Sequence, residues 1–304
     1  MSGRFRTFAV SALAVTLTTG LVGCGDDDST ETAATDTSAV SGSVGSTTTT
    51  TSAATPTKVP VGLADYSFDI PATLTAGPTE FVATNSGSEE HHMTLVKLKD
   101  GQTLGDVIAV LSGDVAKGLE ENQLVPGPQG VAPGGTQSIV LDLEAGGYVA
   151  LCAIPSPDGL PHAAKGMVKE ITVAPAATEA ELSAVPDSPK VTLKDYSFEL
   201  PSDFDGQGAF RVENAGNKPH EIVFYKIADG STYEDAVSYM TATTPPAGPP
   251  PFTGAGGVTA FSPGQVAGMV LDLDPGTYVA VCFLPATDGK THLQHGMIQE
   301  VEIS

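Results

Sequence analysis

The chain has 304 residues, enough for two ordinary domains, and 40% of them are hydrophobic, so each domain can build a core. The formal net charge is -22 with only 14 Lys and Arg residues, which argues against nucleic-acid binding because neutralising phosphates requires cationic side chains. With 34 Gly, 23 Pro and 6% aromatic residues, the composition favours short strands joined by turns, and therefore an all-β protein.

The first 23 residues have the layout of a secretory signal peptide. A basic start at Arg4 and Arg6 precedes an apolar run that is short for a membrane-spanning helix and lacks a basic stop-transfer flank. The sequence LVGC, which ends at Cys24, resembles the lipobox of bacterial lipoproteins, in which this cysteine becomes the lipidated first residue. The resemblance implies an extracytoplasmic protein that is lipid-anchored to the bacterial cell membrane through Cys24. The alternative is an ordinary secretory signal with a chance cysteine.

Residues 24–57 are rich in Thr, Ser, Ala and Gly and contain almost no large apolar residue. Such a segment cannot bury enough surface to offset the entropy lost on ordering. We therefore predict a disordered tether between the membrane anchor and the folded part.

The remaining sequence is a tandem duplication. VGLADYSFDIP at 61–71 returns as VTLKDYSFELP at 191–201, and SIVLDLEAGGYVALC returns as AGMVLDLDPGTYVAVC. The final cysteines of the second pair, Cys152 and Cys282, are 130 residues apart. This self-similarity predicts two copies of one domain with a flexible linker between them. The predicted domains are residues 58–174 and 190–304, and the linker is residues 175–189.

Each copy is predicted to be an antiparallel β-sandwich with one short helix on a crossover loop. Runs of β-forming residues such as 269–273 and 278–282 are separated by an Asp-Pro-Gly turn. Residues 100–111 and 229–240 both place a Thr N-cap before acidic first-turn residues and apolar positions, which indicates a helix start. The Pro-rich stretch 241–257 is predicted to be irregular.

Both copies supply His, Cys, His and Met in the same order, with the downstream spacing C-x9-H-x4-M. Two imidazoles and a thiolate with a weak axial thioether are the ligand set of a blue copper site, because soft sulfur favours Cu(I) and imidazole serves both oxidation states. The predicted copper ligands are His91, Cys152, His162 and Met167 in the first copy, and His220, Cys282, His292 and Met297 in the second.

The first copy offers two adjacent histidines, His91 and His92. His91 is the predicted ligand because it lies six residues after an asparagine, as His220 does. By the period of two along a strand, His92, which corresponds to Glu221, should point outwards. We predict that His92 and His295 are exposed loop histidines rather than parts of a second metal site.

These residues resemble the cupredoxin family, which includes plastocyanin, azurin and the type 1 domains of copper nitrite reductases. The segment NAGNKPHEIVF, which contains His220, resembles the first-histidine segment of plastocyanins, and H-x4-M matches the spacing they use. The resemblance covers both copies and implies Greek-key sandwiches with one type 1 copper each. One departure is the nine-residue gap between Cys and His, which is longer than in plastocyanin or azurin; Pro155, Pro285 and Asp-Gly pairs are predicted to shape it into a turn.

The histidine count argues against an enzyme. Multicopper oxidases and nitrite reductases need further histidines for their other coppers, commonly one beside the type 1 cysteine, and here neither cysteine has a histidine neighbour. Six histidines, four of them already assigned, cannot build a trinuclear cluster. We therefore expect a carrier of single electrons between membrane redox proteins, working through the solvent-facing edges of His162 and His292.

Other hypotheses stay open. The protein could bind or buffer copper without acting as an electron carrier, or it could be a cupredoxin-like module kept for interaction. A disulfide between Cys152 and Cys282 would suit an oxidising compartment, but it would have to link equivalent poles of two domains.

Overall fold

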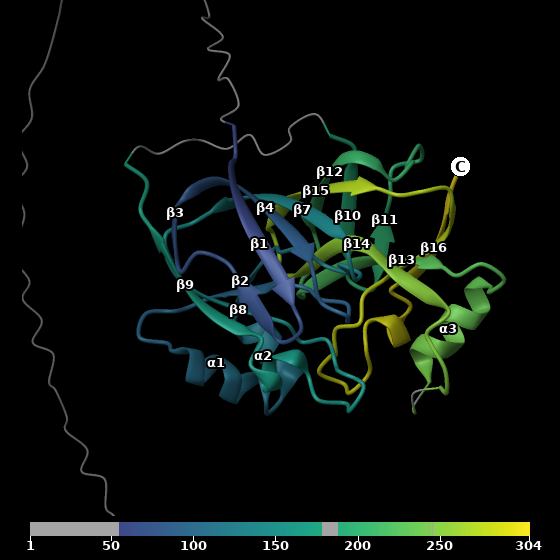
Figure 1. Cartoon of the computed structure of the whole chain (residues 1–304), viewed down its shortest axis with the longest axis horizontal. Coiled ribbons are helices and arrows are strands. Elements are labelled where there is room, and N and C mark those ends of the chain that lie inside the picture. Colours follow the sequence, from purple (N-terminus) through teal and green to yellow (C-terminus); the bar gives the residue numbers. More distant parts are fainter. Residues whose placement is uncertain (1–54, 178–187, 243, 245) are drawn as a thin grey trace, which may run out of the picture. The chain divides into compact units, whose positions relative to one another are not determined.

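The computed structural model describes residues 55–177, 188–242, 244 and 246–304 (Figure 1). The chain divides into two units, residues 1–50 and residues 51–304, and both copies of the repeat lie in the second. The predicted signal peptide, Cys24, and most of the predicted tether and linker lie outside the described residues. Within those residues no helix is long and apolar enough to cross a membrane.

The first copy contains nine strands, two α-helices and a 3-10 helix, η1. The strands are β1 (Thr57–Ala64), β2 (Ser67–Asp69), β3 (Thr73–Thr75), β4 (Gly77–Asn85), β5 (Thr94–Lys97), β6 (Gln123–Val125), β7 (Thr136–Leu143), β8 (Gly146–Leu151) and β9 (Val168–Ala174). The helices are α1 (Leu104–Leu111), α2 (Val115–Glu121) and η1 (His162–Lys165).

The described residues of the second copy follow a similar order, with eight strands, one α-helix and the 3-10 helix η2. The strands are β10 (Lys190–Lys194), β11 (Ser197–Glu199), β12 (Gln207–Asn214), β13 (His220–Ile227), β14 (Phe252–Phe261), β15 (Val266–Asp272), β16 (Gly276–Val281) and β17 (Ile298–Ile303). The helices are α3 (Tyr233–Thr241) and η2 (Leu293–His295).

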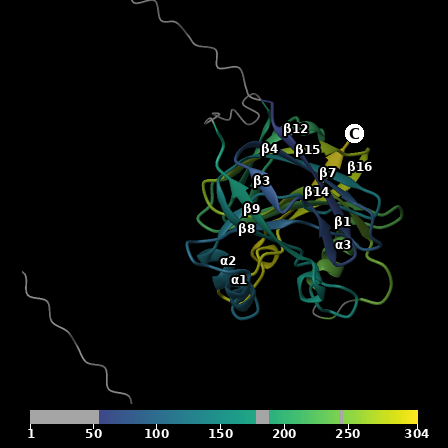
Figure 2. The ribbon, with the colours of Figure 1, turned by 60° about the vertical axis from the view of Figure 1, so that its left-hand side comes forward.

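One eight-stranded sheet runs through both copies, in the order β11-β10-β12-β15-β7-β4-β1-β2. The copies meet where β15 pairs antiparallel with β7, which places Met269 opposite Ile139. The second layer of the first copy is a five-stranded sheet, β3-β9-β8-β5-β6, and that of the second copy is a four-stranded sheet, β14-β13-β16-β17. Helices α1 and α2 lie together in both ribbon views, apart from α3 (Figures 1 and 2).

Strands β1, β4, β7 and β12 of the shared sheet bury alternate residues, as the pleat requires, whereas β8, β13 and β16 of the second layers bury consecutive residues. In β7 the side chains of Gln137, Ile139, Leu141 and Leu143 are buried, whereas those between them are not. Inward-facing residues of this kind from both copies form one core cluster. The prediction of an all-β protein is confirmed.

The strand directions differ from the prediction in one respect. Strand β1 pairs with β4, and β10 pairs with β12, in parallel, so the shared sheet is mixed rather than purely antiparallel. The chain passes through intervening strands before it returns beside the first one, and this connection allows the two paired strands to run in the same direction.

Both predicted helices are present, and both are capped as expected. Thr103 and Thr232 are the N-caps of α1 and α3, and each forms a capping box with an aspartate three residues later. The sequence did not predict α2, which begins after the N-cap Asp114.

The prediction of an irregular 241–257 stretch is wrong for its end, because β14 begins at Phe252. Its glycines allow β14 to pack tightly against β13. A Cβ on Gly257 would lie 2.1 Å from the carbonyl oxygen of Ile222.

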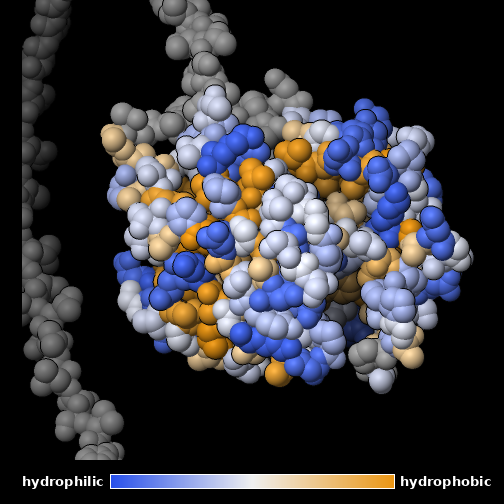
Figure 3. Space-filling model, in the orientation of Figure 1, coloured by the Kyte–Doolittle hydropathy of each residue, from blue (hydrophilic) through white to orange (hydrophobic). Residues whose placement is uncertain are grey.

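The surface is not uniformly polar despite the net charge of -22. Figure 3 shows apolar residues gathered at the lower left, over the region of α1 and α2, between hydrophilic residues. Val115 at the start of α2 is one of the exposed large apolar side chains.

Candidate metal centres

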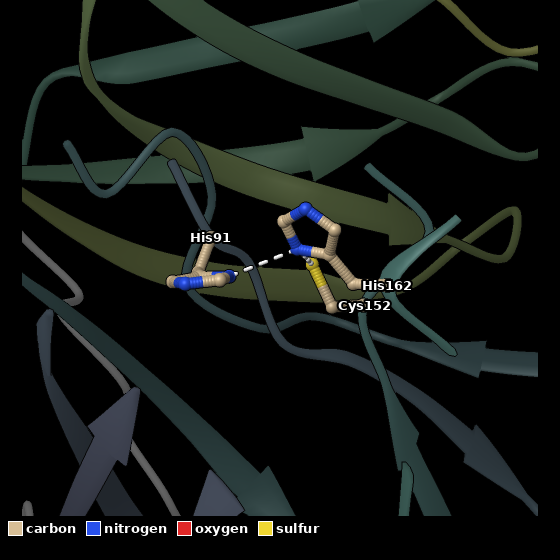
Figure 4. Close-up of side chains that lie close together, drawn as sticks. All are labelled: His91, Cys152 and His162. Carbon is tan, nitrogen blue, oxygen red and sulfur yellow. Dashed lines mark hydrogen bonds between the residues drawn. The ribbon is translucent and has the colours of Figure 1, made fainter. Parts of the chain in front are cut away.

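His91, Cys152 and His162 point toward one another in the first copy (Figure 4). Nδ1 of His91 lies 3.0 Å from Nδ1 of His162, and Sγ of Cys152 lies 3.4 Å from the same atom. All three donor atoms lie within 4.8 Å of one another, and all three residues are buried. The three strongest ligand candidates of the first copy therefore form one group.

The second copy repeats the arrangement with His220, Cys282 and His292. The two Nδ1 atoms are 3.1 Å apart, and Sγ of Cys282 is 3.4 Å from Nδ1 of His292. Within the described ranges no third group of three or more His, Cys, Asp or Glu side chains comes close enough to hold one ion.

A buried asparagine turn places the first histidine of each group. In the first copy, the side-chain amide of Asn85 donates to the carbonyl oxygens of Glu89 at 2.7 Å and Val131 at 2.8 Å. Gly87 within this turn has to be glycine, because a Cβ there would lie 2.8 Å from Nε2 of His91. Asn214 makes the same pair of hydrogen bonds before His220, which opens β13.

The cysteines end strands, and the second histidines follow a short turn. Cys152 comes directly after β8, and Pro155 forms an isolated β-bridge with Pro161 just before η1. Gly159 has a φ of +83°, which suits the turn that closes this bridge. The predicted turn in the nine-residue gap is confirmed, and it brings His162 back to the end of β8.

The methionines are fixed to the same group through their main chains. The amide of Cys152 donates to the carbonyl oxygen of Met167 at 3.2 Å, and the amide of Met167 donates to that of His162 at 3.0 Å. Met297 makes the equivalent bonds in the second copy. Both methionine side chains are fully buried in the core cluster that contains the two cysteines. Axial coordination by these thioethers stays a prediction.

The donor atoms fit one metal ion in each copy. Metal–nitrogen bonds of about 2.0 Å and metal–sulfur bonds of about 2.3 Å put neighbouring donors around a trigonal ion roughly 3.5 Å apart, close to the separations of the two groups. Two imidazoles and a thiolate, with a thioether nearby, suit copper better than the closed four-ligand sets of structural zinc. The two groups therefore fit copper, one site per copy.

Burial dominates the titration of the donors. It raises the pKa of the Cys152 thiol to about 12 and that of Cys282 well above its ordinary value. Burial also lowers the pKa of His91 and His220, and it lowers that of His292 to about 4, with the nearby His220 as the second cause. Without metal these thiols are protonated and these imidazoles neutral at pH 7, so metal binding releases a proton from each cysteine.

Carboxylates hold the outer ring nitrogens of the first copy. Nε2 of His91 lies 3.1 Å from Oδ1 of Asp65, and Nε2 of His162 lies 2.9 Å from Oε2 of Glu89. Such partners fix the ring orientation and make Nδ1 a stronger donor. Hydrogen bonds from Ser88, ahead of the one with His91, hold the pKa of Asp65 well below its usual range.

The second copy keeps only one of these carboxylate contacts. Asp195 lies 3.0 Å from Nε2 of His220, but Lys218 takes the place of Glu89. Lys218 instead pairs with Glu120 of the first copy at 2.8 Å. The two centres therefore have matching donors but different charges around the second histidine.

Three predictions about single residues need correction. His92 is buried rather than outward-pointing, with only 7% of its surface exposed, because it packs against Gln129, which bonds to Glu221 of the second copy. The second correction concerns His162 and His292, whose ring edges were predicted to face solvent. Both are buried in the described structure: His162 is 0% exposed beneath Glu89, and His292 is 2% exposed. His295 is only partly exposed, since it stacks on Tyr196.

Cys152 and Cys282 are free, and each lies in the histidine group of its own copy. A disulfide between Cys152 and Cys282 is therefore excluded.

The carboxylate partners of the first histidines were not identified from the sequence. Asp65 and Asp195 lie in the repeated DYSF motif, and their identity in both copies was the available signal. Tyr66 and Tyr196 follow them with a φ of 65°, a left-handed conformation that is rare for a bulky residue. Each tyrosine ring packs edge-on against the second histidine of its copy.

No protein-family model matches the chain, and a search of curated proteins also returned no match. Similar solved structures include reduced auracyanin from Roseiflexus castenholzii (23% identity, 41% of this chain, 100% of that chain, TM-score 0.29). They also include auracyanin A from Chloroflexus aurantiacus (22% identity, 39% of this chain, 99% of that chain, TM-score 0.29). A copper nitrite reductase from Nitrosomonas europaea spans both copies (14% identity, 82% of this chain, 94% of that chain, TM-score 0.24).

Because these TM-scores are low, the assignment of the fold rests on the features of the chain itself. These are the two repeated sandwiches, the strand that ends at each cysteine, and the histidine group at the same place in both copies. The described part of the chain is a tandem of two cupredoxin-like domains.

Proposed function

We propose that the protein carries single electrons through two type 1 copper centres, one in each copy, and that it is not an enzyme. The observation that carries this proposal is the presence of two buried His-Cys-His groups with nearly the same donor separations. When bound, copper supplies a one-electron change between Cu(I) and Cu(II).

The residues around each group favour a site that keeps its shape. The first histidines are held between the donor cluster and a carboxylate, and the cysteines and methionines are tied by main-chain hydrogen bonds. A site that is already formed and closed to water changes little when its charge changes, which suits rapid electron transfer.

The location and the partners of the carrier are part of the proposal. The LVGC sequence at Cys24 supports a lipid anchor on the outer side of a bacterial membrane, where membrane redox proteins would be electron donor and acceptor. Since both second histidines are covered, electrons would enter through covering residues such as Glu89 and Tyr66 rather than through an exposed imidazole edge.

A potentiometric titration of the copper-loaded protein, followed by visible absorption, tests this function. We expect reversible uptake of two electrons per chain, and of one electron after Cys152→Ser or after Cys282→Ser. His295→Gln, a change outside both donor groups, should leave the uptake at two electrons per chain. Binding of Cu(I) alone, without reversible oxidation, would instead support copper handling.

A further inference from the structure

His92 and Glu221 occupy equivalent positions in the two copies, and each binds the main chain beside a cysteine. Nε2 of His92 accepts a hydrogen bond from the Ala153 amide at 2.8 Å. Oε1 of Glu221 accepts one from the Phe283 amide at 2.9 Å. Ala153 and Phe283 each directly follow the cysteine of their copy, so both side chains lie one peptide away from a metal centre.

Gln129 joins these two side chains across the boundary between the copies. Nδ1 of His92 donates to Oε1 of Gln129 at 2.9 Å, and Nε2 of Gln129 donates to Oε2 of Glu221 at 2.8 Å. The Ala153 amide needs the lone pair of Nε2, which leaves the hydrogen of His92 on Nδ1, facing Gln129. With exposed fractions of 7% for His92 and 5% for both Gln129 and Glu221, all three side chains are buried.

We infer that this chain of hydrogen bonds, Ala153–His92–Gln129–Glu221–Phe283, is the path for electron exchange between the two copper centres. The inference rests on the function proposed above and extends it from two separate centres to a coupled pair. In each exchange one electron leaves the reduced centre and reaches the oxidised one. No proton is transferred, and no covalent bond forms or breaks.

The chain is continuous between the two cysteines. It consists of covalent bonds within residues and four hydrogen bonds between them, and it contains no gap across which an electron would have to pass through space. Electronic coupling decays more slowly along bonds than across such gaps. The chain also ends at the thiolates, the softest donors and therefore those that share most electron density with copper.

Among the residues that the structure describes, the other hydrogen bonds between the copies do not end beside Cys152 or Cys282. Nε2 of Gln265, just before β15, donates to the carbonyl oxygen of Leu124 in β6 at 2.7 Å. That carbonyl also accepts from the Ser262 amide at 3.1 Å, so it keeps a partner if Gln265 is replaced. Gln265 therefore provides a matched control for Gln129.

Intramolecular electron exchange after pulsed reduction of the copper-loaded protein tests the inference. The concentration-independent step that follows initial reduction should slow at least tenfold in Gln129→Met, while the absorption bands and reduction potentials of both centres stay unchanged. In Gln265→Met, which also removes one amide from the boundary, the rate should stay within twofold of the wild type. If Gln129→Met does not accumulate as a folded protein, His92→Phe interrupts the same chain at another link.

A measurement without copper tests the chain itself. In the metal-free protein, nuclear magnetic resonance should find slow hydrogen exchange at the Ala153 and Phe283 amides and hydrogen on Nδ1 of His92. Fast exchange at both amides would overturn the inference.

The outcomes separate this inference from the proposed function. Two reversible copper centres with an unchanged exchange rate in Gln129→Met, or with an equal loss of rate in Gln265→Met, would overturn the inference alone. A wild-type protein without two reversible copper centres would overturn the proposed function, and the inference with it.

Discussion

At the residue scale, the two metal centres differ most at one pair of equivalent positions, Glu89 and Lys218. The Glu89 carboxylate bonds to His162, whereas Lys218 lies near His292 and contributes to the lowering of its pKa. A negative charge beside the second histidine stabilises the oxidised centre, and a positive charge has the opposite effect. The first centre should therefore have the lower reduction potential.

Glu89→Gln should raise the potential of the first centre by about 60 mV. This corresponds to about 1.4 kcal/mol for one electron, close to the lower end of the contribution of a hydrogen bond to a charged group. Spectroelectrochemistry of the Cys282→Ser background isolates this centre. Glu213→Gln, a change at an exposed carboxylate paired with Lys190, serves as the control. An unchanged or lowered potential in Glu89→Gln would contradict the electrostatic argument.

Burial of His92 should make the metal-free protein sensitive to acid. Desolvation lowers its pKa from 6.5 to about 4, so as the pH falls the unfolded state binds a proton that the folded state does not. The contribution of neutral His92 to the free energy of unfolding is fully present above about pH 6.5 and is lost as the pH falls toward 4.

The free energy of unfolding of the wild type should fall between pH 7 and pH 5, and a single group with this pKa shift accounts for about 2 kcal/mol of that fall. In His92→Gln the fall should therefore be smaller by about 2 kcal/mol. Urea unfolding at both pH values measures the difference. Equal losses in the two proteins would show that His92 is not the group responsible.

The grouping of His, Cys and His in each copy could be predicted from the sequence, because these residues recur in the same order in both copies. The environment of His92 could not. His92 precedes β5 and bonds to Gln129, while His91 bonds to His162, so the two side chains do have different surroundings. The surroundings of His92 are the boundary with the second copy rather than water. Periodicity in the sequence distinguishes the two faces of a strand, but it does not show whether water or another part of the protein covers each face.

At the element scale, the turn before β13 positions the first histidine of the second copy. A Cβ on Gly216 would lie 2.6 Å from Oδ1 of Asp195 and 2.8 Å from Nε2 of His220, so Gly216→Ala must push these groups apart. We expect copper affinity at the second centre to fall by about 10- to 100-fold, the usual effect of losing a hydrogen-bond partner of a ligand. Isothermal titration in the Cys152→Ser background measures it.

Gly105→Ala provides the control for this change. Gly105 lies in α1, where a Cβ meets its nearest atom at an ordinary 3.6 Å. The substitution should leave copper affinity unchanged and stabilise the helix by up to about 1 kcal/mol. Equal affinities of the second centre in both alanine variants would mean that the turn does not position His220.

Elements with strong local signals were predictable, and those determined by packing were not. The Thr caps of α1 and α3 indicated where these helices begin. The glycines of β14 are poor strand formers, and the strand exists because β13 accepts a close approach of the backbone at Gly257. That interaction involves residues distant in sequence, so composition alone gave the wrong result.

At the scale of the whole molecule, the two copies form one folded unit through the β15–β7 pair and a continuous core. We predict that cleavage at a protease site introduced between residues 178 and 187 leaves the two copies associated. Size-exclusion chromatography of the cleaved protein should give a single peak at the size of the intact protein. Two separate peaks would show that the linker, rather than the shared sheet, holds the copies together.

The duplication predicted two sandwiches, but the sheet between them could not be predicted. The apolar and polar residues of β7 and β15 follow the pattern expected for a strand at an exposed sheet edge. Pairing between the two strands uses backbone hydrogen bonds, which do not depend on which side chains are apolar. The hydrogen bonds that join His92, Gln129 and Glu221 depend on contact between the two copies, so they could not be predicted from the sequence of either copy.

The central claim is that each copy holds one copper ion through its His-Cys-His group. Copper content and visible absorption of the purified, copper-loaded protein, measured beside Cys152→Ser and Cys282→Ser, test it most directly. We predict two copper ions per wild-type chain with an intense copper–thiolate band, and one ion with a reduced band in each variant. A wild-type chain that binds no copper, or a full band that persists in either variant, would contradict the claim.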